Sequence, residues 1–279
     1  MTTLDAIIVG AVQGFTEFLP VSSSGNLVVT RYFYGVPDLT LQFDVLLHGG
    51  TLAAVVAALW KDILAIGRDV LAWNERGKRL LTALVIATVP GALFGYLFGG
   101  RIDELFCEKG IMRGGLMISP YQLVGAAFIC TAYFILRPAN DIIKKRLAAG
   151  EAGTAMSAIT YQNALVIGLA QALAVVPGIS RSGATLSAGI WSGMSQRDAA
   201  RFSFLMAIPI ILGAVAHQVH EAWVPLQYDA NMRPMLVGVA CAAVTGFIAV
   251  KWMLRLLESK DLHKFIVYLW IIGLLCVAS

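Results

Sequence analysis

The chain has 279 residues, of which 58% are hydrophobic and only 14% are charged, and its mean hydropathy is +0.75. Soluble domains carry about 25% charged residues, so this composition excludes an ordinary soluble protein and indicates a chain that crosses a membrane several times. The net charge of +4 is better explained by basic cytoplasmic loops than by nucleic-acid binding. We therefore expect membrane lipids, and no nucleic acid, as partners.

The first predicted element is an apolar run that is too short to span a membrane. Residues 5–20 end at Pro20, whereas a spanning helix needs about 20 apolar residues. A serine-rich turn and a second short apolar stretch, residues 27–34, follow. This order predicts a re-entrant hairpin, and its irregular polar tip must be buried in protein or line a wet cavity.

Three spanning helices are predicted next, at about residues 40–60, 80–99 and 120–136, and the polar residues 137–157 then link the two halves of the chain.

The second half repeats this order of elements. An apolar run at residues 160–176 breaks at Pro177 and Gly178 and resumes at residues 184–194, which predicts a second re-entrant hairpin. Three more spans are expected at about residues 202–220, 234–254 and 264–278.

The two hairpins also resemble each other in sequence. At one constant offset, Gly10, Gln13, Ser22, Ser24 and Gly25 match Gly168, Gln171, Ser180, Ser182 and Gly183. We therefore predict a single membrane domain, residues 1–279, with repeated halves at about residues 1–140 and 155–279.

The distribution of lysine and arginine predicts the orientation of the spans. Most basic residues lie in the loop 61–79, in the linker 137–157 and between the last two spans, whereas the loops 100–119 and 221–233 carry few. Because basic loops stay in the cytoplasm, both termini are expected outside, and the two hairpins enter from opposite sides. The predicted fold is therefore an all-α polytopic membrane protein with six transmembrane helices, two re-entrant helical hairpins and inverted-topology repeats, which places a site near the midplane.

The tip of the first hairpin carries a carboxylate inside an apolar segment. Glu17 follows Gln13 by four residues, so both side chains lie on one face of a helix. An ionisable residue at membrane depth is costly and indicates a functional site. The alternative is that Glu17 only ends a helix near the membrane surface.

The tip of the second hairpin, PGISRSGAT at residues 177–185, is typical of a phosphate site. Ser180, Ser182 and Thr185 offer hydroxyls, and the planar guanidinium of Arg181 can bind two phosphate oxygens at once. A helix that begins near Ser182 would add its N-terminal amides. The alternative is that Arg181 reaches the membrane surface and the serines are simple helix caps.

His48 is a weaker candidate within a predicted span. It follows Asp44 by four residues and can face the same cavity, but a histidine hydrogen-bonded inside the helix bundle explains it equally well.

The segments VQGFTEFLPVSSSG (residues 12–25) and PGISRSGAT together resemble the BacA-type undecaprenyl-pyrophosphate phosphatases of bacterial inner membranes, and the similarity extends through essentially the whole chain. The resemblance implies a multi-pass protein with its active site facing the periplasm. It implies hydrolysis of undecaprenyl diphosphate to undecaprenyl phosphate and inorganic phosphate. That reaction recycles the lipid carrier of peptidoglycan synthesis and confers bacitracin resistance.

The resemblance also implies roles for individual residues. The motif positions fall on Glu17, Ser23, Arg181 and Thr185, and Gln13 stands where some members have glutamate. We expect Glu17 to hold a divalent cation, Mg²⁺ or Ca²⁺, and Ser23 to be the nucleophile, with metal-activated water as the alternative. The expected catalytic residues are Glu17, Ser23, His48 and Arg181, and the expected substrate-binding residues are Gln13, Ser22, Ser24, Asn26, Ser180, Ser182 and Thr185.

The chain departs from the family pattern at Asn26, where the motif has histidine. An amide cannot accept and release a proton near neutral pH. Either Glu17 or His48 handles the proton, or the activity is weak, or the substrate differs.

A second function fits the same architecture. Inverted repeats with broken helices are typical of transporters, so a flippase for polyprenyl phosphate is the alternative to a phosphatase. The sequence also leaves a homodimer open.

Overall fold

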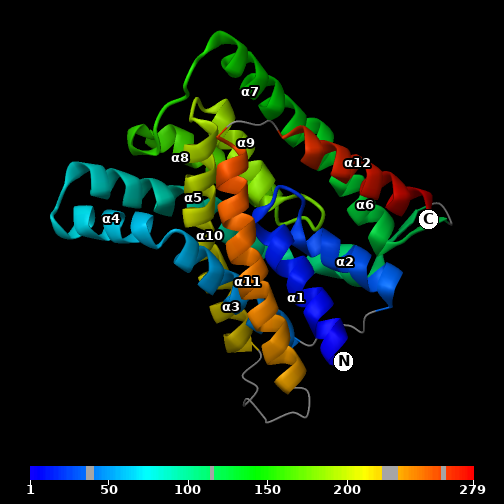
Figure 1. The fold of residues 1–279 in the computed structure, drawn as a ribbon. Coiled ribbons are helices and arrows are strands. Elements are labelled where there is room, and N and C mark those ends of the chain that lie inside the picture. Colours follow the sequence, from blue (N-terminus) through cyan, green and yellow to red (C-terminus); the bar gives the residue numbers. More distant parts are fainter. Residues whose placement is uncertain (36–40, 114–115, 222–231, 259–261) are drawn as a thin grey trace.

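The computed structural model describes residues 1–279 except 36–40, 114–115, 222–231 and 259–261, and these described residues form an almost entirely helical protein (Figure 1). The helices of the first half are α1 (Thr3–Phe18), α2 (Ser23–Tyr34), α3 (Leu41–Ala58), α4 (Trp60–Leu71), α5 (Glu75–Asp103), α6 (Pro120–Cys130) and α7 (Arg137–Ala149). Those of the second half are α8 (Tyr161–Leu173), α9 (Arg181–Trp191), α10 (Gln196–Glu221), α11 (Met232–Leu256) and α12 (His263–Ala278).

Short elements complete the fold. Two π-helical turns, η1 (Glu104–Lys109) and η2 (Thr131–Leu136), follow α5 and α6, and a 3₁₀ turn, η3 (Met156–Ala158), precedes α8. The strands β1 (Ile111–Arg113) and β2 (Leu116–Ile118) pair antiparallel, with Met112 opposite Met117. The all-α fold class is confirmed, with this small hairpin as an addition that the sequence did not predict.

Several helices are suited to cross a membrane. Four continuous helical stretches in the described residues are long and apolar enough: Glu75–Cys107, Pro120–Ala149, Gln196–Ala216 and Met232–Leu256. The pair α3 and α4 passes the same test together but bends by 72° between them, and α12 is a shorter apolar helix. These helices establish a multi-pass membrane protein, while the exact number of six spans stays a prediction.

Both predicted interruptions are present. α1 ends at Phe18 because Leu19 is extended and Pro20 follows, and α2 begins at Ser23 after a break of four residues. α8 ends at Leu173, and α9 begins only at Arg181. Each pair of short helices therefore carries its polar segment at the break between them.

The linker between the halves is more ordered than its polar composition suggests. Its first 13 residues form α7, which continues α6 through the π-helical turn η2. α7 buries Ala139, Asn140 and Ile143 on one face. The spacing of these residues by one helical turn allows a mostly polar segment to pack as an amphipathic helix.

The first helix of each hairpin packs against a helix from the other half of the chain. α1 lies along α11, as the blue and orange helices of Figure 1 show, and α8 packs against α5. The contacts are backbone to backbone, since a Cβ at Gly10 would lie 2.2 Å from Gly238 O and one at Gly168 would lie 2.7 Å from Ala87 O. Each hairpin is therefore held by the opposite half, which brings the two tips together.

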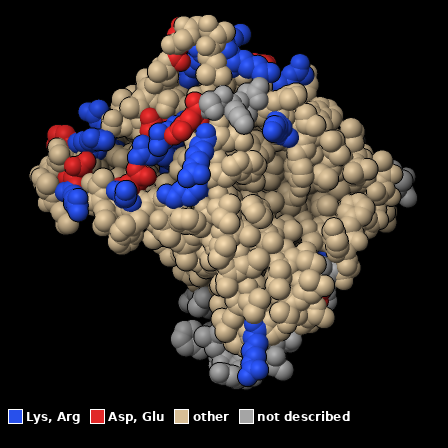
Figure 2. Space-filling model, in the orientation of Figure 1, with Lys and Arg blue, Asp and Glu red and all other residues tan. Residues whose placement is uncertain are grey.

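Charge is concentrated on one part of the surface. In Figure 2 the lysine and arginine side chains gather over the α4–α5 hairpin and the upper end of the molecule, and much of the remaining visible surface is uncharged. Lys61 and Arg68 on α4 and Lys144 and Lys145 on α7 are all exposed. This arrangement agrees with basic loops that share one side of a membrane.

Candidate active site

The two hairpin tips meet at one cavity of about 180 Å³. Both tips and α3 contribute to its wall, which consists of Thr16, Glu17, Ser22, Ser23, Ser24, His48, Ala174, Ile179, Ser180, Arg181 and Ser182. The cavity therefore joins residues that are more than 150 positions apart in the sequence, as the sequence predicted for the serines, Glu17 and Arg181.

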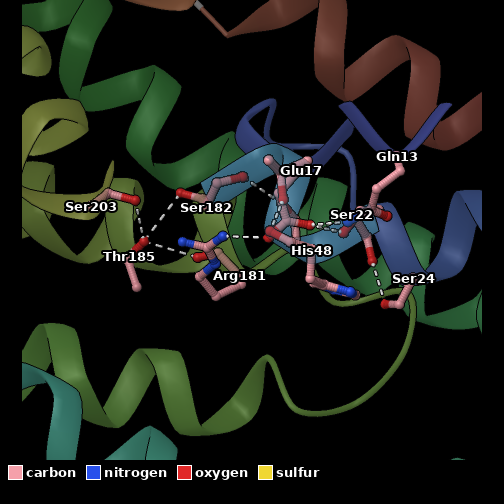
Figure 3. Close-up of polar contacts among 12 residues, drawn as sticks. Gln13, Glu17, Ser22, Ser24, His48, Arg181, Ser182, Thr185 and Ser203 are labelled. Atoms are coloured by element: carbon pink, nitrogen blue, oxygen red, sulfur yellow. Dashed lines mark hydrogen bonds and ion pairs between the residues drawn. The ribbon is translucent and has the colours of Figure 1, made fainter. Parts of the chain in front are cut away.

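Glu17 occupies the centre of this group. Its Oε2 accepts a hydrogen bond of 2.6 Å from Ser23 Oγ and one of 3.1 Å from Gln13 Nε2. Its Oε1 forms an ion pair of 2.7 Å with Arg181 Nη2 across the two hairpins. In Figure 3 Arg181 reaches Glu17 from one side while Ser22 and Ser24 lie on the other. One buried carboxylate thus contacts both a hydroxyl and a guanidinium.

The ion pair bears on the alternatives that the sequence allowed. The side chains of Arg181 and Glu17 are only 15% and 7% exposed, so both are turned into the protein and not outward from it. Burying charges is favourable only when they are paired and hydrogen-bonded; the two charges are paired here, and Arg181 Nη1 is left without a partner among the described residues.

Two helix N-termini point their first turns at the site. Ser22 caps α2, where its Oγ accepts from Gly25 N at 3.4 Å, and Ser180 caps α9, where its Oγ accepts from Gly183 N at 3.0 Å. The first residues of these helices are Ser23 and Arg181. Because a helix N-terminus carries free amides and partial positive charge, two of them beside one cavity favour an anionic ligand.

Direct hydrogen bonds lock the two tips to each other. Gly178 N donates to Ser22 Oγ at 3.2 Å, and Ser182 Oγ donates to Leu19 O at 2.7 Å. The backbone of Ser22 has a positive φ of 64°, which is uncommon for a residue other than glycine and costs about 1–3 kcal/mol. The site is therefore preorganised by the protein itself.

The His48 side chain lines the cavity from α3. This agrees with the hypothesis that His48 faces the same cavity as Glu17. Its Nδ1 lies 2.9 Å from Asp44 O in the preceding turn of the helix. A carbonyl oxygen only accepts hydrogen bonds, so Nδ1 is the donor, and in the neutral imidazole Nε2 is left as the acceptor. His48 can thus take up a proton through Nε2.

Three of the predicted substrate-binding residues do not line the cavity. Asn26 Nδ2 donates to Val21 O and Ser22 O at 2.8 Å each, and its Oδ1 accepts from the hydroxyl of Tyr268 on α12. Its side chain therefore supports the first tip from behind.

Gln13 and Thr185 also lie behind the wall. Gln13 contacts Glu17, and Thr185 Oγ1 donates to Arg181 O at 2.9 Å and lies 2.6 Å from Ser203 Oγ.

Four residues of the site escaped the sequence analysis. Thr16, Ala174 and Ile179 line the cavity, and Thr131 hydrogen-bonds to the second tip. Thr16 and Ile179 are immediate neighbours of recognised motif residues, which was an available signal. Ala174 and Thr131 gave none, because an alanine and a threonine within an apolar helix carry no distinctive pattern.

The oxygen donors beside Glu17 fit a divalent cation. The Glu17 carboxylate and the hydroxyls of Ser22, Ser23 and Ser24 line one cavity, whereas Gln13 Nε2 donates a hydrogen bond to Glu17 from behind the wall. Mg²⁺ and Ca²⁺ prefer such oxygens, and Mg²⁺ is often held by one or two carboxylates together with substrate phosphates. No cluster of three His, Cys, Asp or Glu side chains occurs in the residues that the structure describes, so phosphate oxygens would have to complete the coordination.

Gly178 provides a test of the tip geometry. Its φ is +96°, and an added Cβ would lie 2.6 Å from Ala127 Cβ, whereas Gly193 has a similar φ of +99° with nothing within 4 Å. We expect Gly193→Ala to cost only the backbone strain of about 1–3 kcal/mol. Gly178→Ala adds a steric overlap of about 1–3 kcal/mol and should also lower kcat. Thermal unfolding and turnover of the two variants measure the difference, and equal losses would contradict the close packing at Gly178.

Comparisons with known proteins show relatives over the whole chain. The family model of the bacitracin resistance protein BacA matches residues 6–275. A protein named undecaprenyl-diphosphatase from Moorella thermoacetica is 39% identical over 280 residues, which cover 100% of this chain and 98% of that protein. Proteins of the same name from Rubrobacter xylanophilus and Methanobrevibacter smithii are 37% and 34% identical, over 99% of this chain and 97% and 96% of theirs.

Proposed function

The chain belongs to the bacitracin resistance protein BacA family, and from this premise we infer that it is an undecaprenyl-diphosphatase. It is an integral membrane hydrolase that converts undecaprenyl diphosphate to undecaprenyl phosphate and inorganic phosphate. The reaction returns the lipid carrier to peptidoglycan synthesis and confers resistance to bacitracin. The observation that carries this function is the contact of Glu17 with both Ser23 and Arg181 in one cavity of a membrane protein.

The roles of the residues follow from their contacts. Arg181 Nη1 is buried and has no hydrogen-bond partner among the described residues, so it is free to donate to a phosphate oxygen while Nη2 holds Glu17. Ser23 and the N-terminal amides of α2 and α9 lie beside the same space. The terminal phosphate of the substrate would bind between these groups, where positive charge neutralises the charge of the transition state.

The hydrogen bond of 2.6 Å from Ser23 to Glu17 supports Ser23 as the nucleophile. Ser23 Oγ forms a bond to the terminal phosphorus, its proton passes to Glu17, and the bond to the bridging oxygen breaks so that undecaprenyl phosphate leaves. Water then attacks the phosphoserine and releases inorganic phosphate, and Ser23 regains a proton. Direct attack by water is the alternative, and a Ser23→Ala variant that retains turnover would support it.

A divalent cation is part of this proposal. Glu17, together with the phosphate oxygens, would hold Mg²⁺ or Ca²⁺, and the bound ion would add positive charge beside the terminal phosphate. The family departure at position 26 does not remove a proton acceptor from the cavity, since Asn26 faces Tyr268 while Glu17 and His48 both line the wall.

Phosphate release by the purified protein tests the function directly. The detergent-solubilised chain should release inorganic phosphate from undecaprenyl diphosphate, and Ser23→Ala and Glu17→Gln should abolish most of that release. Lipid transfer between leaflets without any phosphate release would instead support the flippase alternative.

His48 should have a measurable but secondary effect. Since its Nε2 is available as an acceptor, His48→Ala removes one proton acceptor while the Ser23–Glu17 pair stays, and we expect kcat to fall by about 10²-fold, at the lower end for general acid–base catalysis. His263→Ala, on the start of α12 outside the cavity wall, is the control. Normal turnover of a folded His48→Ala variant would leave His48 a structural residue.

We place the protein in the bacterial inner membrane with its cavity open to the periplasmic side. The concentration of basic residues over α4, α5 and α7 supports this orientation, which makes the α4–α5 hairpin cytoplasmic and the β1–β2 hairpin external. The inverted repeat and the homodimer stay predictions.

Cysteine labelling measures the orientation. In a variant without the native cysteines, Leu71→Cys and Lys145→Cys should resist an impermeant thiol reagent in intact cells, and Met112→Cys should react. All three positions are exposed on the protein, so burial does not decide the result. The position 230, which the sequence also places outside, lies outside the described residues. The reverse labelling pattern would contradict the proposed orientation.

A further inference from the structure

The backbone of the second tip packs against α6 and against the π-helical turn η2, which continues α6. Gly178 and Gly25, one from each tip, both rest on this helix. A Cβ at Gly178 would lie 2.8 Å from Val124 O, and one at Gly25 would lie 2.5 Å from the Phe128 ring. The two tips therefore pack against the same face of α6.

Thr131 is a polar residue on this same helix face. It is completely buried, and it follows Ala127 and Phe128 by four and three residues on the same helix face. Its Oγ1 donates to Gly178 O at 3.1 Å and accepts from Ser180 N at 3.4 Å. The single hydroxyl thus bonds to the backbone of the tip on both sides of Ile179.

This use of a hydroxyl differs from that of other helical threonines in the chain. Thr16, Thr30 and Thr88 donate to the carbonyl oxygen four residues earlier in their own helices. Thr131 instead gives both of its hydrogen bonds to another segment, and it is also the first residue of the π-helical turn η2. π-helical turns are rare and occur frequently at functional sites.

The contact lies one residue from the phosphate-binding arginine. Gly178 is clamped from two directions, because its N–H bonds to Ser22 and its C=O bonds to Thr131. Ser180, which receives the second bond, caps the helix that begins with Arg181. These hydrogen bonds, which we call the clamp, fix the last three residues before Arg181. They therefore fix the direction in which the Arg181 side chain extends from the backbone.

We propose that Thr131 is a positioning residue, which holds the second tip so that Arg181 meets the transferred phosphate in the reactive geometry. The proposal rests on the phosphatase function. A misplacement of about 1 Å at a reacting group can cost about 10²-fold in rate, while the lipid tail and the other phosphate contacts stay unchanged. The loss should therefore appear in kcat more than in KM.

Two substitutions test the hydroxyl: Thr131→Val removes it with little change in volume, and Thr131→Ser keeps it. Thr131→Val should lower kcat on undecaprenyl diphosphate at least about tenfold with KM within about threefold. Thr131→Ser keeps the hydroxyl and should stay within about threefold of the native kcat. Thr88→Val, which removes a hydroxyl bonded within its own helix, is the matched control and should retain kcat. Native kcat in Thr131→Val would overturn the proposal.

A double-mutant cycle separates positioning from general stability. In the Arg181→Lys background the positioned group is already lost, so Thr131→Val should then lower kcat by less than about threefold. A residue that only stabilises the fold would lower kcat by the same factor in both backgrounds, because independent effects are additive. Equal factors would therefore overturn the proposal even if the single variant is slow.

Hydrogen exchange tests the proposal without turnover. It is therefore informative even if Thr131→Val folds poorly or the protein is not a phosphatase. Hydrogen exchange of a peptide that contains residues 177–181 should be faster in Thr131→Val and in Thr131→Cys, whose thiol is a weaker donor, than in native protein and Thr88→Val. Native protection in both Thr131 variants would disprove the clamp. Failure of the native protein to release phosphate would disprove the function alone.

Discussion

Replacing Glu17 with glutamine should reduce kcat by about 10⁴-fold, at the upper end of what a general base contributes. The amide has nearly the shape of the carboxylate, but it cannot take the proton of Ser23 Oγ, which lies 2.6 Å away. It also removes the negative charge that holds Arg181 Nη2 at 2.7 Å. One substitution therefore disables the nucleophile and releases the group that binds the phosphate.

The same change also affects stability, and the measurement has to separate the two effects. Breaking a buried ion pair by removing one partner typically costs about 3–5 kcal/mol, and Arg181 is only 15% exposed. Asp62→Asn is the matched control, because Asp62 on α4 pairs with Arg201 on α10 and lies outside the cavity wall. We expect both variants to lose thermal stability and only Glu17→Gln to lose turnover per folded molecule. A Glu17→Gln variant that turns over like Asp62→Asn would contradict the assigned base.

Replacing Arg181 with lysine should lower kcat by about 10²–10³-fold, the scale of one lost transition-state hydrogen bond. Lysine keeps the positive charge and can still reach a carboxylate, but it lacks the planar fork that serves Glu17 through Nη2 and a phosphate oxygen through Nη1. Because the charge is unchanged, the loss would reflect the missing fork, and steady-state phosphate release measures it.

Arg146→Lys is the control for this second substitution. Arg146 also uses both terminal nitrogens, with Nη1 at 2.8 Å from Met194 O and Nη2 at 3.1 Å from Ile190 O. These bonds hold the end of α9 far from the cavity wall, so Arg146→Lys should affect stability and leave kcat nearly unchanged. If Arg181→Lys shows near-native turnover, Arg181 serves the fold and not the phosphate.

The contact between the tips explains why the site can be built from irregular backbone. Polar backbone at membrane depth is tolerated only where protein or a wet cavity satisfies it. Here Gly178 N, Ser180 N and Leu19 O are satisfied by the side chains of Ser22, Thr131 and Ser182. Polar side chains of both tips, and Thr131 beside them, therefore have a structural role.

Much of the fold follows from local properties of the sequence. The apolar runs, the existence of breaks near Pro20 and Pro177, and the all-α class were predictable, because run length and helix-breaking residues act locally; α8 ends at Leu173, earlier than the expected break. Glu17 and Arg181 could be singled out as candidates for the same reason, since an ionisable group in an apolar segment stands out by itself, while the roles expected for them and for Ser23 stay predictions.

The sequence by itself determined the class of protein, the two interrupted helices and the candidate residues for the chemistry. Only the tertiary structure decided which of these residues share the cavity. Asn26 and Ser23 lie one helical turn apart, yet Ser23 lines the cavity and Asn26 faces Tyr268 on α12. Thr131 gave no sequence signal, because its partners Gly178 and Ser180 are 47 and 49 residues away. Such contacts depend on how α6 and α12 pack beneath the tips, and packing between distant segments is not encoded in any local pattern.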